Sequence, residues 1–164
     1  MPHSQTSRGS RRVVAAALAL SCAAALLSGC ALLEGPTPVT PKRETPAKPE
    51  VKPELVPGGS AEENLPFFTE VLREYAAGDG VVKGEPVSRA FIDAGFDKSL
   101  MQVSFDSSKT GLPADNIFVS VRFGADCLVG QLVAEDRSFV AKNEPALGPN
   151  QDICLIGKTN PITW

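Results

Sequence analysis

Histidine is almost missing from this sequence, which has one such residue, His3, in 164 positions. Histidine is the usual general base near neutral pH, the partner that orients serine and cysteine nucleophiles, and the commonest metal ligand. No imidazole is available downstream of position 3, so none of these sites can be built there. The sequence therefore argues against the hydrolases and metal centres that depend on histidine.

Positive charge is also scarce beyond the N-terminus. Because Arg8, Arg11 and Arg12 lie within the first 29 residues, thirteen lysines and arginines face nineteen aspartates and glutamates in the rest, whose net charge is near −6. Phosphate binding needs a basic stripe that displaces counterions, and an acidic surface is not attracted to anionic lipid. We therefore expect no nucleic-acid partner and no electrostatic adsorption to a membrane.

One long apolar run, residues 13–27, follows the three arginines. It is shorter than the roughly 20 apolar residues of a membrane-spanning helix, and its position is typical of a secretory signal. It ends in Leu27-Ser28-Gly29-Cys30, which resembles the lipobox of bacterial lipoproteins. That resemblance implies cleavage after Gly29, lipid on the Cys30 thiol, and a mature chain anchored to the outer face of the cell membrane.

Two alternatives stay open for this leader. It can be an ordinary signal peptide that is cut elsewhere, in which case Cys30 is incidental. Ser10-Arg11-Arg12 and the valines after it also loosely resemble a twin-arginine export signal, although paired arginines are common in basic leaders and general secretion is favoured.

Cysteine is limited to four positions. Cys22 would leave with the leader and Cys30 would carry lipid, so Cys127 and Cys154 remain. In an oxidising compartment two remaining cysteines most simply pair, and their separation of 27 residues suggests about 3 to 4 kcal/mol of stabilisation. A redox-active pair or a thiolate metal site would need a Cys-x-x-Cys spacing or further ligands. We predict a structural disulfide.

Composition divides the chain into a signal peptide (1–29), a lipidated cysteine with a proline-rich disordered tether (30–59), and a small globular domain (60–164). Seven prolines and a balance of lysine and glutamate leave the tether little to bury. In a polyproline II conformation about 30 residues reach roughly 90 Å. The regular step of Pro49, Pro53 and Pro57 also fits a ligand for an aromatic groove, but a spacer is favoured.

Two helices are expected at the start of the domain. Ser60 with Glu63 fits a capping box, whereas Asn64 with Pro66 fits a later start. Gly78 supplies the stop, and a second helix is predicted over residues 86–94, with Gly95 left-handed after it. The side chains expected inward are Leu65, Phe68, Val71, Leu72, Tyr75, Phe91 and Ile92.

After Gly95 the apolar period changes from 3.6 to 2, which indicates strands. We expect strands over residues 101–106, 117–123, 127–134, 139–141 and 153–157, with a tight reversal at Gly124-Ala125-Asp126. Cys127 and Cys154 would each lie in a strand. The predicted fold is α+β: two N-terminal helices packed on a four- to five-stranded, mainly antiparallel sheet, with one disulfide.

The stretches 139–142 and 148–157 resemble the closing part of an uncharacterised domain found in lipoproteins of actinobacteria. The resemblance covers the globular region only, and such a family brings no assigned activity. It implies an origin in a high-GC Gram-positive bacterium.

Several motifs have chemical interpretations that fail in context. Lys109-Thr110-Gly111 matches one box of the penicillin-binding proteins and Ala114-Asp115-Asn116 nearly matches another, but their order is reversed and no Ser-x-x-Lys precedes them, so a loop is favoured. The glycines of residues 78–84 follow a helix and read as a connector, not a phosphate cradle. The acidic residues Glu62, Glu63, Glu70 and Glu74 fit a solvent face, and a calcium loop would need closer spacing than that of Asn143, Glu144, Asn150 and Asp152.

Trp164, the only tryptophan, either closes the core or offers an aromatic platform to a glycan or peptide, and core capping is favoured. The same weighing applies to Phe67.

The leading functional hypothesis is a cell-envelope lipoprotein whose domain binds wall polymer or an envelope protein without catalysis. The alternatives are an accessory or inhibitory factor for an envelope enzyme, and a histidine-independent hydrolase that uses carboxylates or a serine and lysine pair. We expect the domain to fold without metal or cofactor.

Overall fold

The computed structural model of this protein describes residues 45–164. The predicted signal peptide, Cys30 and residues 30–44 of the predicted tether lie outside the described residues.

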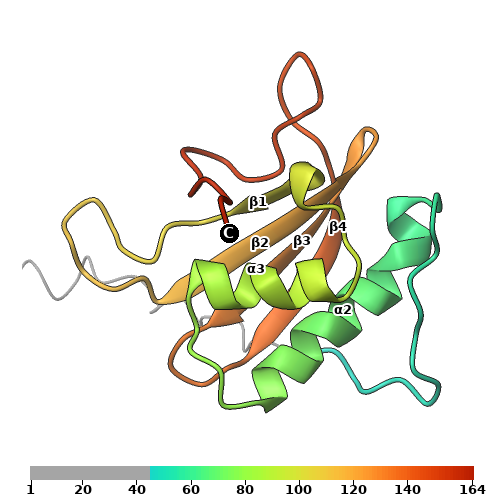
Figure 1. Cartoon of the computed structure of the whole chain (residues 1–164), viewed down its shortest axis with the longest axis horizontal. Helices are drawn as coiled ribbons and strands as arrows, with labels where there is room; N and C mark the ends of the chain where they lie inside the picture. Colours follow the sequence, from blue (N-terminus) through green and yellow to red (C-terminus); the bar gives the residue numbers. More distant parts are fainter. Residues whose placement is uncertain (1–44) are drawn as a thin grey trace, which may run out of the picture. The chain divides into compact units, whose positions relative to one another are not determined.

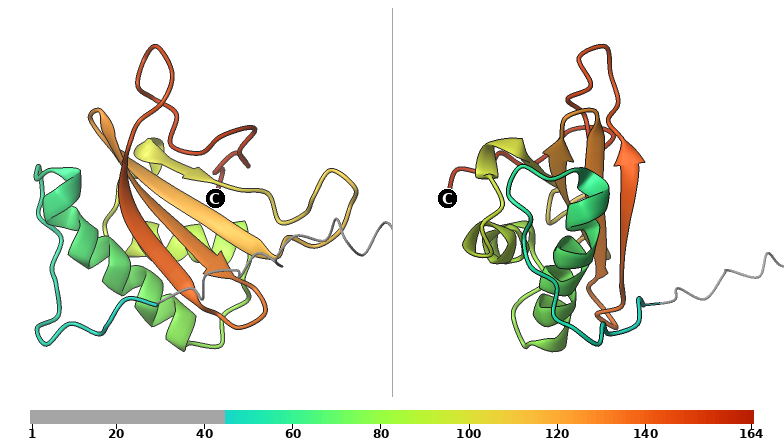
Figure 2. Two further views of the ribbon diagram at one scale, coloured as in Figure 1. Left: turned by 180° about the vertical axis from the view of Figure 1, so that it is seen from behind. Right: turned by 90° about the vertical axis from the view of Figure 1, so that its right-hand side faces the viewer.

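Two helices cover one face of a four-stranded antiparallel sheet (Figures 1 and 2). The strands follow one another in the sheet in the order β1-β2-β3-β4. This arrangement confirms the predicted α+β class with four strands. The elements are α2 (Ala61–Ala77), α3 (Gly84–Asp93), the 3-10 turn η2 (Lys98–Leu100), β1 (Met101–Val103), β2 (Asn116–Phe123), β3 (Asp126–Val133) and β4 (Phe139–Pro145).

Helix α2 begins with the capping box formed by Ser60 and Glu63. The Ser60 hydroxyl accepts from the Glu63 N–H at 3.2 Å, and the Glu63 carboxylate accepts from the Ser60 N–H at 2.8 Å. The later start at Asn64 is therefore wrong, and Pro66 lies inside the helix. Gly78 ends α2 as expected, but with φ of −83°, whereas Gly95 after α3 has the left-handed φ of +104°.

The core lies between the helices and the sheet. The ring of Phe68 on α2 is 4.6 Å from that of Phe91 on α3 and 5.9 Å from that of Phe96, centroid to centroid. Leu72 packs beside them, and all four side chains are at most 4% exposed. Leu65, Tyr75 and Ile92 are only partly buried, so they border the core. Aromatic packing thus fixes both helices on one sheet face.

Strands β2 and β3 form the tightest hairpin. Phe123 pairs with Asp126, so Gly124 and Ala125 make a two-residue turn in which Gly124 alone has a positive φ, +62°. A glycine at the first position of such a turn matches the right-handed twist of the strands. The predicted reversal at this point is confirmed.

The predicted fifth strand, residues 153–157, is wrong. Ile153 makes a single bridge to Leu147, and the residues after it are irregular. Strand β4 instead runs to Pro145, beyond the predicted end at residue 141. Residues 146–164, here called the C-terminal segment, therefore leave the sheet at the end of β4.

Residues 45–59, here called the N-terminal strap, contact the domain although composition assigned them to the tether. The Arg73 guanidinium on α2 donates to the carbonyls of Pro46 and Ala47 at 2.7 and 2.9 Å. The Lys52 ammonium donates to Glu74 at 2.6 Å, and Leu55 packs against the core. Within residues 45–164, contacts with the domain therefore already occur at Pro46, ahead of the predicted boundary at Ser60.

Candidate functional site

The sheet has a second face, turned away from α2 and α3, which we call the far face. Gly130 faces the helices, since a Cβ there would meet Leu72 and Phe68, and residues of the opposite parity therefore point to the far face. The C-terminal segment covers only part of this face. The side chains on the far face of the sheet include Gln102, Ser104, Phe118, Ser120, Arg122, Cys127, Val129, Gln131, Val140, Lys142 and Glu144.

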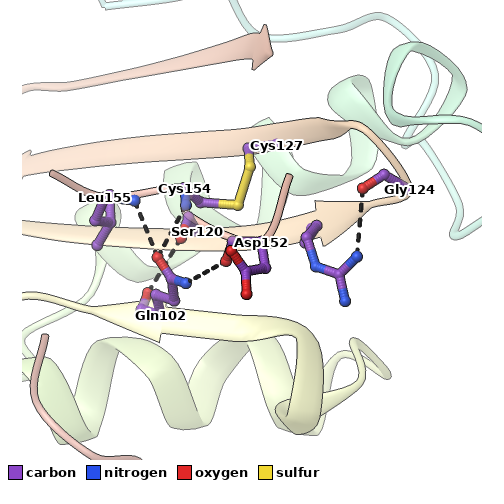
Figure 3. Close-up of a disulfide and its surroundings, with 8 residues drawn as sticks. Gln102, Ser120, Gly124, Cys127, Asp152, Cys154 and Leu155 are labelled. Carbon is purple, nitrogen blue, oxygen red and sulfur yellow. Dashed lines mark hydrogen bonds between the residues drawn. A yellow bond between two sulfur atoms is a disulfide. The ribbon is translucent and has the colours of Figure 1, made fainter. Parts of the chain in front are cut away.

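Gln102 on β1 holds the C-terminal segment against the far face (Figure 3). Its side-chain carbonyl accepts from the N–H groups of Cys154 and Leu155, both at 3.0 Å. Its amide nitrogen donates to the Asp152 carbonyl at 2.9 Å. One side chain therefore takes the place of a strand partner for three backbone groups of residues 152–155.

The same segment is bonded covalently to β3. Cys127 and Cys154 form a disulfide with a Cα–Cα distance of 5.6 Å, which confirms the predicted pairing (Figure 3). Cys127 lies in β3 as expected, but Cys154 lies in the irregular segment and not in a strand. The disulfide closes a loop of 27 residues and ties the segment to the start of β3, an inner strand of the sheet.

The end of the chain returns to the helix side around β1. The Asn160 N–H donates to the Val103 carbonyl at 2.8 Å, and the Trp164 indole N–H donates to the Ser88 hydroxyl on α3 at 3.1 Å. Lys98 reaches the Trp164 carbonyl at 2.9 Å. Trp164 packs against the core, as favoured from the sequence, and Phe67 does so beside Phe96 at 5.5 Å between ring centroids.

A groove of about 330 Å³ lies where the C-terminal segment meets the exposed part of the far face. We call it the far-face groove. A second hollow of about 230 Å³ shares Phe118 and Val129 with it and extends to Gln131, Val140, Lys142 and Glu144. The groove is lined by Ser104, Phe118, Val129, Cys154, Leu155, Ile156, Lys158 and Thr159.

The lining of the groove is mainly apolar. Ile156 is 89% exposed, so a large aliphatic side chain stands at the groove with almost no cover. The Ser104 hydroxyl accepts from the Phe118 N–H at 3.0 Å, which ties it to the sheet backbone. Among the described residues that line the groove, Lys158 is the one that carries a charge. This set of groups suits apolar contact with a partner that also carries an acceptor or an anion.

Comparison with known protein families gives one match. Residues 72–158 match a domain of unknown function, DUF6993. The chain belongs to this family. The match covers the second part of α2, α3, all four strands, the disulfide and the groove lining up to Lys158. No curated protein and no solved structure matches the chain.

The family agrees with the expected resemblance to an uncharacterised domain. Its bounds leave out the N-terminal strap, although Arg73, inside the matched residues, donates to the carbonyls of Pro46 and Ala47 in the strap. The lipobox also lies outside the matched residues.

The other predicted motifs do not meet at the groove. Lys109-Thr110-Gly111 lies in the loop between β1 and β2, as expected. Gly78 and Gly80 lie in the connector between α2 and α3, as expected, whereas Gly84 is the first residue of α3. Glu70, expected on a solvent face, is instead 6% exposed and pairs with Arg73 at 2.9 Å. The expectation was wrong because the N-terminal strap covers this side of α2, where Arg73 binds the strap backbone.

Glu144 and Asp152, the two carboxylates weighed for calcium, belong to no metal-binding group among the described residues. Within residues 45–164 no group of three or more histidine, cysteine, aspartate or glutamate side chains is placed to hold a metal ion. No helix in the same described part is long and apolar enough to cross a membrane.

Arg137 is a structural residue that sequence reasoning missed. Its guanidinium donates to the carbonyls of Tyr75, Ala76 and Gly80 at 2.7 to 2.8 Å, and so binds the C-terminal end of α2. Burial raises the pKa of Tyr75, against the opposing effect of the Arg137 charge. No local pattern marks this role, because Arg137 comes from the loop between β3 and β4.

Proposed function

We propose that this chain is a lipid-anchored protein of the bacterial cell envelope, whose DUF6993 domain binds another envelope protein through the far-face groove and without catalysis. The observation that carries the proposal is the groove itself, an apolar hollow walled by a segment that the Cys127–Cys154 disulfide holds in place. A rigid apolar wall lowers the entropic cost of binding, because little has to be ordered when the partner arrives.

A protein partner fits this lining better than wall polymer does. Phe118, Val129, Leu155 and Ile156 offer dispersion contacts and few hydrogen bonds, whereas a glycan presents hydroxyl groups that need polar partners. An exposed Ile156 beside Lys158 resembles the apolar centre and polar rim of a protein interface. An accessory or inhibitory role toward an envelope enzyme would use the same surface.

The proposal is tested with a photo-crosslinking amino acid at position 156 of the full-length protein in intact cells. Position 81 is the matched control, because Val81 is also an exposed aliphatic residue, 61% exposed, in the connector between α2 and α3. We expect a discrete protein adduct at position 156 that is absent at position 81. The same adducts at both positions, or adducts with wall polymer alone, would refute a protein partner at the groove.

The anchor is tested separately. Cys30→Ser should release the protein from the membrane fraction or leave an uncleaved precursor, because no thiol remains to accept lipid. Wild-type protein whose mature form carries an unacylated Cys30 in mass spectrometry would refute lipidation.

A further inference from the structure

The two edge strands of the sheet, β1 and β4, differ in whether another described backbone segment pairs with them. At β1 the C-terminal segment covers the edge, where Asn160 bonds to Val103. At β4, the other edge, no backbone segment of residues 45–164 pairs with the outer side of the strand. A seven-residue edge strand with free N–H and C=O groups is a template for pairing with another chain.

The hydrogen bonds at either end of β4 show which residues face outward. Ser138 accepts from Val133 and Ala146 donates to Ala125, at 2.9 and 2.7 Å. The register between these bonds is continuous, and antiparallel bonding alternates with a period of two. Even-numbered residues of β4 therefore bond to β3. Ala141 and Asn143 turn their N–H and C=O groups outward.

The charged side chains of β4 make this edge self-complementary. Lys142 and Glu144 are exposed and lie on the far face, where they border the second hollow. If two copies pair antiparallel with Asn143 opposite Asn143, each Lys142 lies directly opposite Glu144 of the second copy. Opposite charges at such positions favour pairing, and like charges oppose it. A shift that places Lys142 opposite Lys142 is therefore disfavoured.

We propose that two copies of this chain associate through antiparallel pairing of their β4 edges, in the register that places Asn143 opposite Asn143. The two Asn143 residues exchange two backbone bonds, and each Ala141 N–H donates to the Pro145 carbonyl of the second copy. Pro145 has no N–H and ends the ladder. The result is an isologous dimer with one continuous eight-stranded sheet. This interface is separate from the groove lining and does not depend on what the groove binds.

Lysine, glutamate and proline on an edge strand usually prevent pairing with unrelated strands. In this register the same residues select a second copy, because Lys142 meets a carboxylate only when the partner strand carries Glu144 at the opposite position. Anchoring to a membrane would assist the dimer by concentrating the copies in a plane.

The proposal is tested by reversing the charges of Lys142 and Glu144 in the full-length chain. Self-association is measured by analytical sedimentation in a detergent whose density matches that of the buffer. We expect the wild type to form dimers as its concentration rises toward about 1 mM. Lys142→Glu and Glu144→Lys alone should each weaken association about tenfold or more, because both cross-strand pairs become repulsive. The double variant should recover the wild-type affinity, and an equimolar mixture of the single variants should form heterodimers.

Lys109→Glu, which makes the same charge change in the exposed loop between β1 and β2, is the control and should not affect association. The proposal would be overturned if the wild type is monomeric at every concentration, or if its dimer affinity is the same in all the charge-reversal variants.

Cysteine cross-linking tests the register independently of the charges. A hydrogen-bonded antiparallel pair has Cα atoms about 5.5 Å apart, within the range of a disulfide. Asn143→Cys should therefore form a disulfide-linked dimer, whereas two cysteines at position 142 are offset along the strands and should not. Preferential cross-linking at position 142 would overturn the proposed register.

Discussion

At the scale of single residues, Gln102 positions one wall of the candidate site. It has no catalytic chemistry of its own, but its side-chain amide binds the backbone of Asp152, Cys154 and Leu155. Two of these residues, Cys154 and Leu155, line the far-face groove. The shape of the groove therefore depends on one amide group from β1, as well as on the disulfide.

Gln102→Ala should loosen the wall of the groove without unfolding the sheet. It leaves the N–H groups of Cys154 and Leu155 without their acceptor, which costs about 1 to 3 kcal/mol if they stay buried. We expect faster amide hydrogen exchange at residues 154 and 155 and a lower unfolding free energy.

Gln131→Ala is the matched control, since Gln131 lies on the same face and its side chain, among the described residues, bonds to that of Asn116 at 2.9 Å and not to the C-terminal segment. In this variant the backbone amides of residues 154 and 155 should exchange at the wild-type rate. Unchanged exchange there in Gln102→Ala would contradict the assigned role.

At the scale of elements, close approach of α2 to β3 depends on Gly130. A Cβ built at this position would lie 2.9 Å from Leu72 Cδ2 and 3.0 Å from Phe68 Cε1. Both side chains are fully buried, so neither can move freely away. The absence of a side chain in the middle of β3 therefore lets the helix lie directly on the sheet.

Gly130→Ala should lower the free energy of unfolding by about 1 to 3 kcal/mol, because the added methyl overpacks the core. Gly78→Ala is the control, since its φ of −83° suits any residue and its added Cβ would have no neighbour closer than 3.6 Å. That change should stay within about 0.5 kcal/mol of the wild type. Denaturant titration that finds equal losses for both variants would contradict the packing argument.

The capping box of α2 should make the free energy of unfolding depend on pH in the acidic range. Hydrogen bonds from the backbone and the hydroxyl of Ser60 lower the pKa of Glu63 from its ordinary value of 4.5. A carboxyl pKa that is lower in the folded state stabilises the fold above the unfolded pKa, and this contribution is lost as the pH falls through the folded pKa.

In Glu63→Gln the melting temperature should therefore fall less steeply with decreasing pH below about pH 4.5 than in the wild type. Some acid dependence should remain, because bonds from the Ser99 hydroxyl and backbone lower the pKa of Asp97 as well. Glu62→Gln on the same helical turn is the control. An identical slope in Glu63→Gln and wild type would refute the contribution of the box.

Elements with a local periodic pattern could be predicted from the sequence. The alternation in residues 117–123 and the apolar spacing around Phe68 and Leu72 are set by neighbours along the chain, and β2, β3 and both helices follow them. The groove wall could not be predicted, because residues 152–155 take their partners from Gln102, about 50 positions earlier. The disulfide could be predicted by counting cysteines, but the place of Cys154 outside the sheet could not.

At the scale of the whole molecule, the N-terminal strap packs on the domain that follows it. Its proline-rich composition predicts a free spacer, yet the strap supplies partners to buried groups of α2. The side chain of Asn64, fully buried, accepts from the Val56 N–H at 2.8 Å and donates to the Val56 carbonyl at 3.1 Å. Proline limits what a segment can do in a helix or central strand, but it does not prevent extended packing on a surface.

Deletion of residues 45–59 should therefore destabilise the domain, although every helix and strand remains. Asn64 loses its bonds to Val56, Arg73 loses two backbone acceptors, and the surface under Leu55 becomes exposed. The lost bonds of Asn64 and Arg73 and the lost aliphatic contact together suggest a decrease of about 2 to 4 kcal/mol in the free energy of unfolding, measured by denaturant titration. Leu55→Ala should reproduce part of this decrease, while Val51→Ala, whose residue is 80% exposed in the same strap, should leave stability unchanged. A deletion variant as stable as the wild type would place the start of the domain at Ser60 and reduce the strap to a spacer that merely touches it.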